Sequence, residues 1–144
     1  MREKIKIDSI NALKSHDQAR VDVLRYLISI IDKKALQLPL GQMTEADEMA
    51  VLLKELKNKE ESKIMFANGQ RDDLVKQVDF EIAVLKNYLP EEMGQAELES
   101  IVEEAVKEAG GVFGSVMKIV MSKVAGRVGG EKIAPLVKQK ISEQ

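Results

Sequence analysis

The side chains best suited to chemistry gather near the carboxyl end of the chain, around a glycine-rich turn. Three glycines of this turn, Gly126, Gly129 and Gly130, allow the backbone to bend sharply and to approach a ligand closely. The guanidinium of Arg127 can bind a phosphate through two parallel hydrogen bonds. The free amide groups at the start of the next helix offer an additional anion site. The residue types of this turn therefore suit a phosphate group.

Further cations surround this turn and extend the predicted site. They are Lys118, Lys123, Lys132, Lys138 and Lys140. Together with Arg127, these lysines lie on two successive predicted helices and the turn between them. Several of these side chains would share one face of a compact three-helix unit, and such a face binds the backbone of a polyanion. We therefore predict nucleic-acid contacts for Lys118, Lys123, Gly126, Arg127, Gly129, Gly130, Lys132 and Lys138.

The same glycines also have a plain structural interpretation, in which they end one helix and begin the next. The turn is no P-loop, because no Gly-Lys-Ser/Thr sequence follows a strand. The chain has only five aromatic residues, so stacking of single-stranded bases has little support. A structured RNA, recognised by its shape and phosphates, fits this composition better, and contact with DNA is not expected.

Residues suited to catalysis are scarce. The chain has no cysteine and one histidine, which excludes thiolate catalysis, cysteine-ligated zinc and the usual catalytic zinc site. His16 lies at a predicted turn, and no nucleophile or orienting acid can be assigned to it. Ser122 and Lys123 are adjacent on a predicted helix and cannot face the same point. We therefore expect no catalytic residue, no metal ion and no cofactor.

Helices must position these side chains, because apolar residues recur at steps of three and four between the few prolines and glycines. No segment alternates with a period of two, so the predicted fold class is all-α. The expected helices cover about 2–14, 18–37, 45–68, 72–89, 98–109, 113–124 and 131–141.

Several local features refine this assignment. The wide apolar face of the second helix predicts a central position in the bundle. Thr44 and Asp47 are close to a capping box at the start of the third helix, whose second half, KELKNKEESK, is expected to be solvated. Pro135 is tolerable in the first turn of the last helix. Pro90 divides the chain into an amino-terminal helical bundle or hairpin, 1–90, and a carboxy-terminal three-helix domain, 91–144.

The charged residues are sorted along the chain. Residues 1–90 have a net charge of zero, residues 91–109 carry seven Glu against Lys107, and residues 110–141 carry six Lys or Arg against Glu131. The amino-terminal segment has no apolar stretch long enough for a signal peptide or a membrane span. We therefore expect a soluble, cytoplasmic protein without membrane contact.

Four stretches of the sequence, in this order and spacing, resemble the YqeY family. They are SINALKSHDQARVDVLRYLISIIDKKAL, KELKNKEES with NGQRDDL, VLKNYLPEEMGQAELESIV and VMKIVMSKVAGRVGGEKIAPLVKQKI. The usual turn of this family is Lys-Gly-Arg-Ala-Asp-Gly. Gly126, Arg127 and Gly130 match it, whereas Ala125, Val128 and Gly129 replace the Lys, Ala and Asp.

The resemblance implies a two-part all-α protein whose tail is similar to that of GatB, the tRNA-handling subunit of glutamyl- and aspartyl-tRNA amidotransferases. The expected function is that of a noncatalytic tRNA-binding or accessory protein, with tRNA, an amidotransferase or an aminoacyl-tRNA synthetase as partner. One alternative is a docking module that contacts a protein through the acidic segment 91–109 or the end of the third helix, without contact to RNA. Another is carbon–nitrogen ligase activity with glutamine as amide donor, a label that the resemblance implies only by association with GatB.

Overall fold

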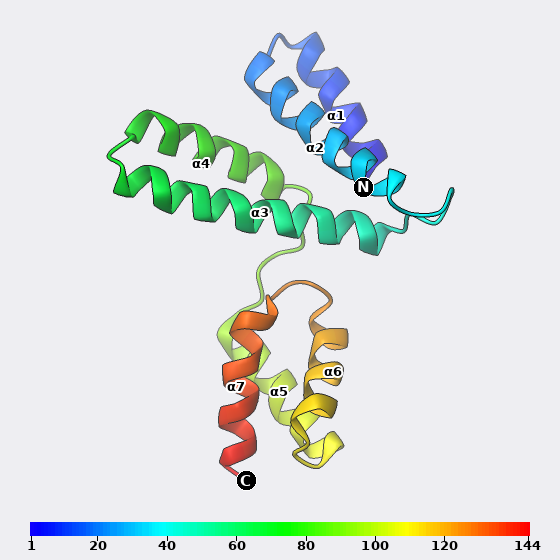
Figure 1. The fold of residues 1–144 in the computed structure, drawn as a ribbon, viewed down its shortest axis with the longest axis vertical. Helices are drawn as coiled ribbons and strands as arrows, with labels where there is room; N and C mark the ends of the chain where they lie inside the picture. The colour runs from blue at the N-terminus through cyan, green and yellow to red at the C-terminus, as the bar shows by residue number, and fades with distance from the viewer. The chain divides into compact units, whose positions relative to one another are not determined.

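The computed structural model describes all residues from 1 to 144 and contains helices and their connections, without a strand. Figure 1 shows the helices in chain order: α1 (Arg2–Lys14), α2 (Gln18–Leu36), α3 (Glu45–Asn68), α4 (Asp72–Lys86), α5 (Gln95–Ala109), α6 (Phe113–Val124) and α7 (Gly130–Ser142). The all-α prediction is confirmed. The chain divides into two compact units, Met1–Leu89 and Pro90–Gln144. None of the helices combines the length and the apolar sequence needed to cross a bilayer.

The first unit consists of two helical hairpins, α1 with α2 and α3 with α4, whose members lie side by side in Figure 1. The central position predicted for α2 is confirmed, because α2 contacts α1, α3 and α4. Aliphatic residues at steps of three and four place one wide face of α2 in the core. The buried core comprises Ile5, Ala12, Val21, Val23, Leu24, Leu27, Ile31, Leu52, Val84, Leu85 and Tyr88.

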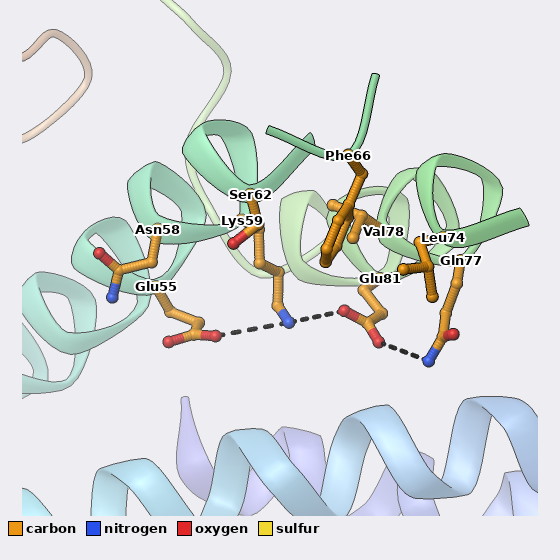
Figure 2. Close-up of a pocket in the computed structure, with 9 residues that line it drawn as sticks. All are labelled: Glu55, Asn58, Lys59, Ser62, Phe66, Leu74, Gln77, Val78 and Glu81. Atoms are coloured by element: carbon orange, nitrogen blue, oxygen red, sulfur yellow. Dashed lines mark hydrogen bonds and ion pairs between the residues drawn. The ribbon is translucent and has the colours of Figure 1, made fainter. Parts of the chain in front are cut away.

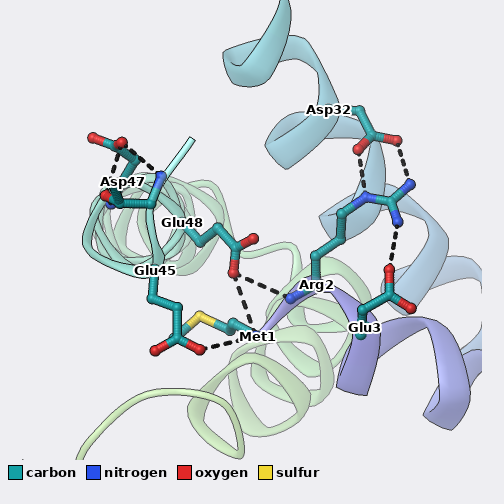
Figure 3. A network of polar contacts seen from close by, with 8 residues as sticks. Met1, Arg2, Glu3, Asp32, Glu45, Asp47 and Glu48 are labelled. Atoms are coloured by element: carbon teal, nitrogen blue, oxygen red, sulfur yellow. Dashed lines mark hydrogen bonds and ion pairs between the residues drawn. The ribbon is translucent and has the colours of Figure 1, made fainter. Parts of the chain in front are cut away.

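Charged groups fasten the first hairpin to the start of α3, as Figure 3 shows. The α-amino group of Met1 lies 3.4 Å from the carboxylate of Glu48, which also accepts a hydrogen bond from the backbone N–H of Arg2. The guanidinium of Arg2 donates to both carboxylate oxygens of Asp32, over 2.6 and 3.1 Å. These hydrogen bonds hold the pKa of Asp32 below its ordinary value. The beginning of α1 thus joins α2 to α3.

The capping box predicted at the start of α3 is confirmed. The backbone N–H of Thr44 donates to Asp47 over 3.0 Å, and the backbone N–H of Asp47 donates to the Thr44 hydroxyl over 3.2 Å. The hydrogen bonds from Thr44 lower the pKa of the Asp47 carboxyl. The reciprocal bonds satisfy two amide groups that would otherwise lack a partner, so the helix begins at Glu45.

The second half of α3 is largely solvated, as predicted, and Lys59 is the exception. The side chain of Lys59 is only 11% exposed, because α4 returns along α3 and brings Glu81 to 2.8 Å from the ammonium group. Glu55 lies 3.4 Å away on the other side (Figure 2). The Tyr26 ring of α2 is 5.2 Å from the same ammonium group. The apolar stem of Lys59 therefore packs between helices while two carboxylates balance its charge.

Tyr88 joins the segment after α4 to α1. The residue is 8% exposed, and its hydroxyl donates a hydrogen bond of 2.5 Å to the carboxylate of Asp8. Burial raises the pKa of the Tyr88 hydroxyl, and the hydrogen bond to Asp8 raises it further. The ammonium group of Lys4 lies 5.7 Å from the centre of the ring. These contacts fix the carboxyl end of the first unit against its first helix.

The second unit packs α5, α6 and α7 around one aliphatic core. Met93 reaches this core from the segment before α5, and Val128 reaches it from the turn before α7. The other buried members come from the three helices: Leu98, Val102, Ala105, Val106, Val116, Val120, Val124, Ile133, Leu136 and Val137. Pro135 was predicted to lie in the first turn of the last helix. Because α7 begins at Gly130, it lies in the second turn instead. It therefore removes one backbone hydrogen bond inside the helix.

The Tyr88 contact predicts a measurable contribution to stability. Tyr88→Phe should lower the free energy of unfolding by about 1–2 kcal/mol, because it removes a hydrogen bond between two largely covered groups. Urea denaturation measures this change. Asp8→Ala removes the acceptor of the same bond, so the double variant should lose much less than the sum of the two single losses. Strictly additive losses would show that the two side chains do not cooperate.

The raised pKa of Tyr88 predicts a loss of stability in alkali. Below about pH 10 the hydroxyl keeps its proton in the folded and the unfolded chain, and the stabilisation is complete. Above this pH the unfolded chain releases the proton while the folded chain retains it, so the free energy of unfolding falls. The difference in unfolding free energy between the natural chain and Tyr88→Phe should therefore shrink as the pH rises from about 9 to 11. A difference independent of pH would contradict the assignment.

Candidate nucleic-acid interface of the second unit

The glycine and arginine turn connects α6 to α7 through two consecutive residues in the left-handed region. Ala125, which caps α6, has a φ of 47°, and Gly126 has a φ of 81°. This conformation suits Gly126, whereas it strains the backbone of Ala125. The Val128 side chain is 8% exposed and lies in the core. The turn is therefore fixed to the unit on both sides of Arg127.

The predicted anion site at the start of α7 faces a carboxylate of the chain itself. Gly129 precedes α7 and Gly130 is its first residue. The carboxylate of Glu131 folds back against Gly129 and fills the space that a Cβ at position 129 would need. A carboxylate in the first turn interacts favourably with the helix dipole. Glu131 thus competes with any external anion at this helix end.

Arg127 is held by the segment that leads into α5. Its Nε donates to the backbone carbonyl of Glu91 over 3.0 Å. Its two terminal nitrogens donate to the two carboxylate oxygens of Glu97, over 3.1 and 3.3 Å. This fork of parallel hydrogen bonds is the geometry predicted for a phosphate, with a carboxylate in the place of the phosphate. Arg127 therefore joins the turn to the start of α5.

Three further cations of α6 and α7 also meet acids. Lys132 lies 2.9 Å from Glu92. Lys140 lies 2.9 Å from Glu103, and hydrogen bonding between them raises the pKa of Lys140 and lowers that of Glu103. Lys123 has two acidic neighbours on α5, Glu104 at 3.7 Å and Glu108 at 4.0 Å. Together with Arg127, four of the six predicted cations are neutralised within the unit.

Lys118 and Lys138 differ from the other four cations. Lys118 is exposed on α6, on a side of the helix that is turned about 140° away from Lys123. The ammonium group of Lys138 lies 5.6 Å from the centre of the Phe113 ring, and no carboxylate pairs with it. These two lysines are the predicted site residues that keep their charge available to a ligand.

Acids of the same unit therefore balance most of the positive charge of the predicted basic face, and its contact with a nucleic acid stays a prediction. Residues 90–144 carry seven Lys or Arg side chains against nine Asp or Glu, a net charge of −2. The physical reason is that α5 packs beside both α6 and α7, so the acidic segment neutralises the basic one. The opposite charges of the two neighbouring segments were the sequence signal for this pairing. The acids that hold the cations, Glu92, Glu97, Glu103 and Glu104, were missed as part of the site.

A hollow lies between α3 and α4 in the first unit (Figure 2). It has a volume of about 280 Å³ and is lined by Glu55, Asn58, Lys59, Ser62, Phe66, Leu74, Gln77, Val78 and Glu81. Its most covered charged group, Lys59, is balanced by Glu55 and Glu81. No buried side-chain nitrogen or oxygen atom of the chain lacks a hydrogen-bond partner. The polar lining of this hollow is therefore explained by the packing of the helices.

The side chains considered for catalysis lie at separate places on the surface. His16 is exposed in the turn between α1 and α2, with a φ of 59°. Ser122 is exposed on α6, while the neighbouring Lys123 is directed to the acids of α5. Nothing in this arrangement brings a nucleophile and a base together.

Comparison with protein families identifies a match over nearly the whole chain. The family described as Yqey-like protein matches residues 2–141. No curated protein matches the chain.

The contacts of Arg127 predict a structural role for this side chain. Arg127→Ala should lower the free energy of unfolding of the second unit by about 1–2 kcal/mol, because three hydrogen bonds between the turn and the start of α5 are lost. Lys118→Ala is the matched control and should change it by less than about 0.5 kcal/mol. Thermal and urea denaturation measure both variants. Equal stability of the two would show that the fork on Glu97 contributes nothing.

Proposed function

The chain belongs to the YqeY family over residues 2–141, and we propose that it is a noncatalytic accessory protein that docks on a tRNA-handling enzyme through protein contacts. The class of enzyme comes from the resemblance of the sequence to the tail of GatB. The preference for protein over RNA rests on one observation, the pairing of four cations with acids of the same unit. Affinity for a polyanion comes from cations that contact its phosphates, and acids of the same unit already engage four of these cations, in a unit of net charge −2.

Apolar side chains at the surface of the first unit support a docking function. Ile64 and Met65, near the end of α3, are 62% and 71% exposed. Ile7, Ile10 and Leu13 of α1 are also exposed. Exposed apolar side chains that gather on one helix are typical of contacts between proteins. The acids of segment 91–109 support docking less, because several are engaged with α6 and α7.

Direct contact of the second unit with tRNA is a second candidate function. It is favoured by Lys118 and Lys138, whose charges meet no carboxylate. Exposed ion pairs contribute only about 0–1 kcal/mol each, so phosphates can replace the carboxylates at some of the other cations. In this case Gly126, Gly129 and Gly130 would admit the RNA backbone close to the turn.

Amide transfer from glutamine is not part of the proposal. This reaction needs an activated nucleophile, and neither His16 nor the pair Ser122 and Lys123 provides one. Hydrolysis of glutamine by the purified protein would reverse this conclusion.

The two candidate functions predict different outcomes when RNA is removed. A complex held by protein contacts should survive nuclease treatment during affinity capture of a purified amidotransferase or aminoacyl-tRNA synthetase. In filter-binding titrations with tRNA at about 50 and 200 mM salt, the protein should show weak affinity with a shallow dependence on salt. Loss of the complex on nuclease treatment, together with a steep salt dependence, would favour tRNA contact instead.

A pair of variants sharpens this test. Lys118→Ala with Lys138→Ala removes the two predicted site cations that no carboxylate pairs with, and it leaves the ion pairs of the second unit intact. Lys57→Ala with Lys76→Ala removes two exposed lysines of the first unit and serves as the control. If tRNA binding is the function, only the first pair should weaken it. Arg127→Ala is unsuitable here, because it disturbs the start of α5.

A further inference from the structure

The outer face of α1 carries aliphatic side chains that the first unit leaves exposed. α1 packs on α2 through the side that contains Ile5, Ser9 and Ala12, which are buried. Ile7, Ile10 and Leu13 are 56%, 46% and 48% exposed. Their spacing of three residues places them in a stripe of about 120°, which extends from Ile7 on the side opposite Ile5 to Leu13 at the edge of the buried face. α1 therefore has two apolar faces, of which one meets no other helix of its unit.

Two lysines border this stripe, and neither is neutralised. Lys6 lies beside the beginning of the stripe and Lys14 at its end, and both are exposed without an ion pair. Some other cations of the unit meet acids: Arg2 pairs with Asp32, Lys59 with Glu81 and Lys63 with Asp79. Glu3, the acid on the same side of α1, lies 3.3 Å from the guanidinium of Arg2. The border of the stripe is therefore positively charged.

We propose that the α1 outer face, defined as Lys6, Ile7, Ile10, Leu13 and Lys14, binds an amphipathic helix of a partner protein whose apolar stripe is bordered by Asp or Glu. This inference rests on the proposed function in that it assumes a protein partner. A helix laid along α1 would complete a three-helix arrangement with α2 and remove the three aliphatic side chains from water. Its carboxylates would pair with the two lysines and fix its position.

Charge argues against other occupants of this face. A second copy of the chain would present the same lysines, so a symmetric pair of outer faces gains no complementary acid. An anionic membrane is recognised by clusters of about four to eight Lys or Arg, whereas this face offers only Lys6 and Lys14. RNA gains little from three aliphatic side chains. An acidic amphipathic helix satisfies both the apolar and the charged part of the face.

Two synthetic peptides test the chemistry of the partner. Both have about 18 residues and leucine at helical spacing, and the leucines are flanked by glutamate in one and by lysine in the other. Fluorescence anisotropy with the full chain should give an affinity at least tenfold higher for the glutamate peptide. Lys6→Glu with Lys14→Glu should reverse this preference, because the lysine peptide then meets opposite charges.

Single variants test the position of the surface. Ile10→Asn should weaken binding of the glutamate peptide at least tenfold. Leu36→Asn is the control, since Leu36 is 87% exposed at the end of α2 and lies outside the face. Circular dichroism checks that each variant is folded, which is expected because the replaced side chains are exposed.

Several results would overturn the inference. They are equal affinity for the two peptides, no binding of either peptide, and unchanged binding by Ile10→Asn. Binding of the chain to vesicles that contain anionic lipid, or a dimer in sedimentation that Ile10→Asn abolishes, would assign the face to another occupant. A nuclease-resistant complex with an enzyme that tolerates Ile10→Asn would overturn this surface alone and leave the proposed function standing.

Discussion

The attraction between the acids of α5 and the cations of α6 and α7 determines how the second unit can act. Three short helices bury an aliphatic core, and around it the opposite charges meet at Arg127, Lys123, Lys132 and Lys140. Each exposed pair is weak by itself. Together they cancel the positive charge on which attraction to a polyanion would depend. The two parallel hydrogen bonds from Arg127 to Glu97 also have a defined geometry, and they fix the turn before α7 to the start of α5.

The first unit uses charged groups in another way, as connections between hairpins. Arg2 and the α-amino group of Met1 join α1 to α2 and α3, while Lys59 joins α3 to α4 beside the Tyr26 ring. In both places an acid compensates a largely covered cation. Such polar connections leave the outer face of α1 without a role in the packing of the unit. Because the packing of the unit does not need the exposed aliphatic residues of α1, these residues indicate a surface for a partner.

The helices could be predicted because they depend on local sequence, although α4 ends at Lys86 and not at residue 89, and α5 begins at Gln95 and not at residue 98. Steps of three and four between apolar residues identify all seven helices, and the Thr44 and Asp47 pair identifies the start of α3. Contacts between distant residues could not be derived in this way. The burial of Lys59 requires the return of α4 along α3, and the neutralisation of Lys123 requires α5 beside α6. The left-handed conformation of Ala125 could not be predicted either. The sequence indicates such a conformation for the adjacent Gly126, whereas alanine rarely adopts it.

The arrangement of neighbouring helices has a consequence for the way in which the chain folds. Nearly all helix contacts join elements that are close in sequence: α1 with α2, α3 with α4, and the three helices of the second unit among themselves. Contacts of such short range are characteristic of rapid folding. The bond from Tyr88 to Asp8 spans 80 positions and is an exception. It can form only once α4 has been synthesised, so in the first ninety residues emerging from a ribosome this hydrogen bond would be among the last to close.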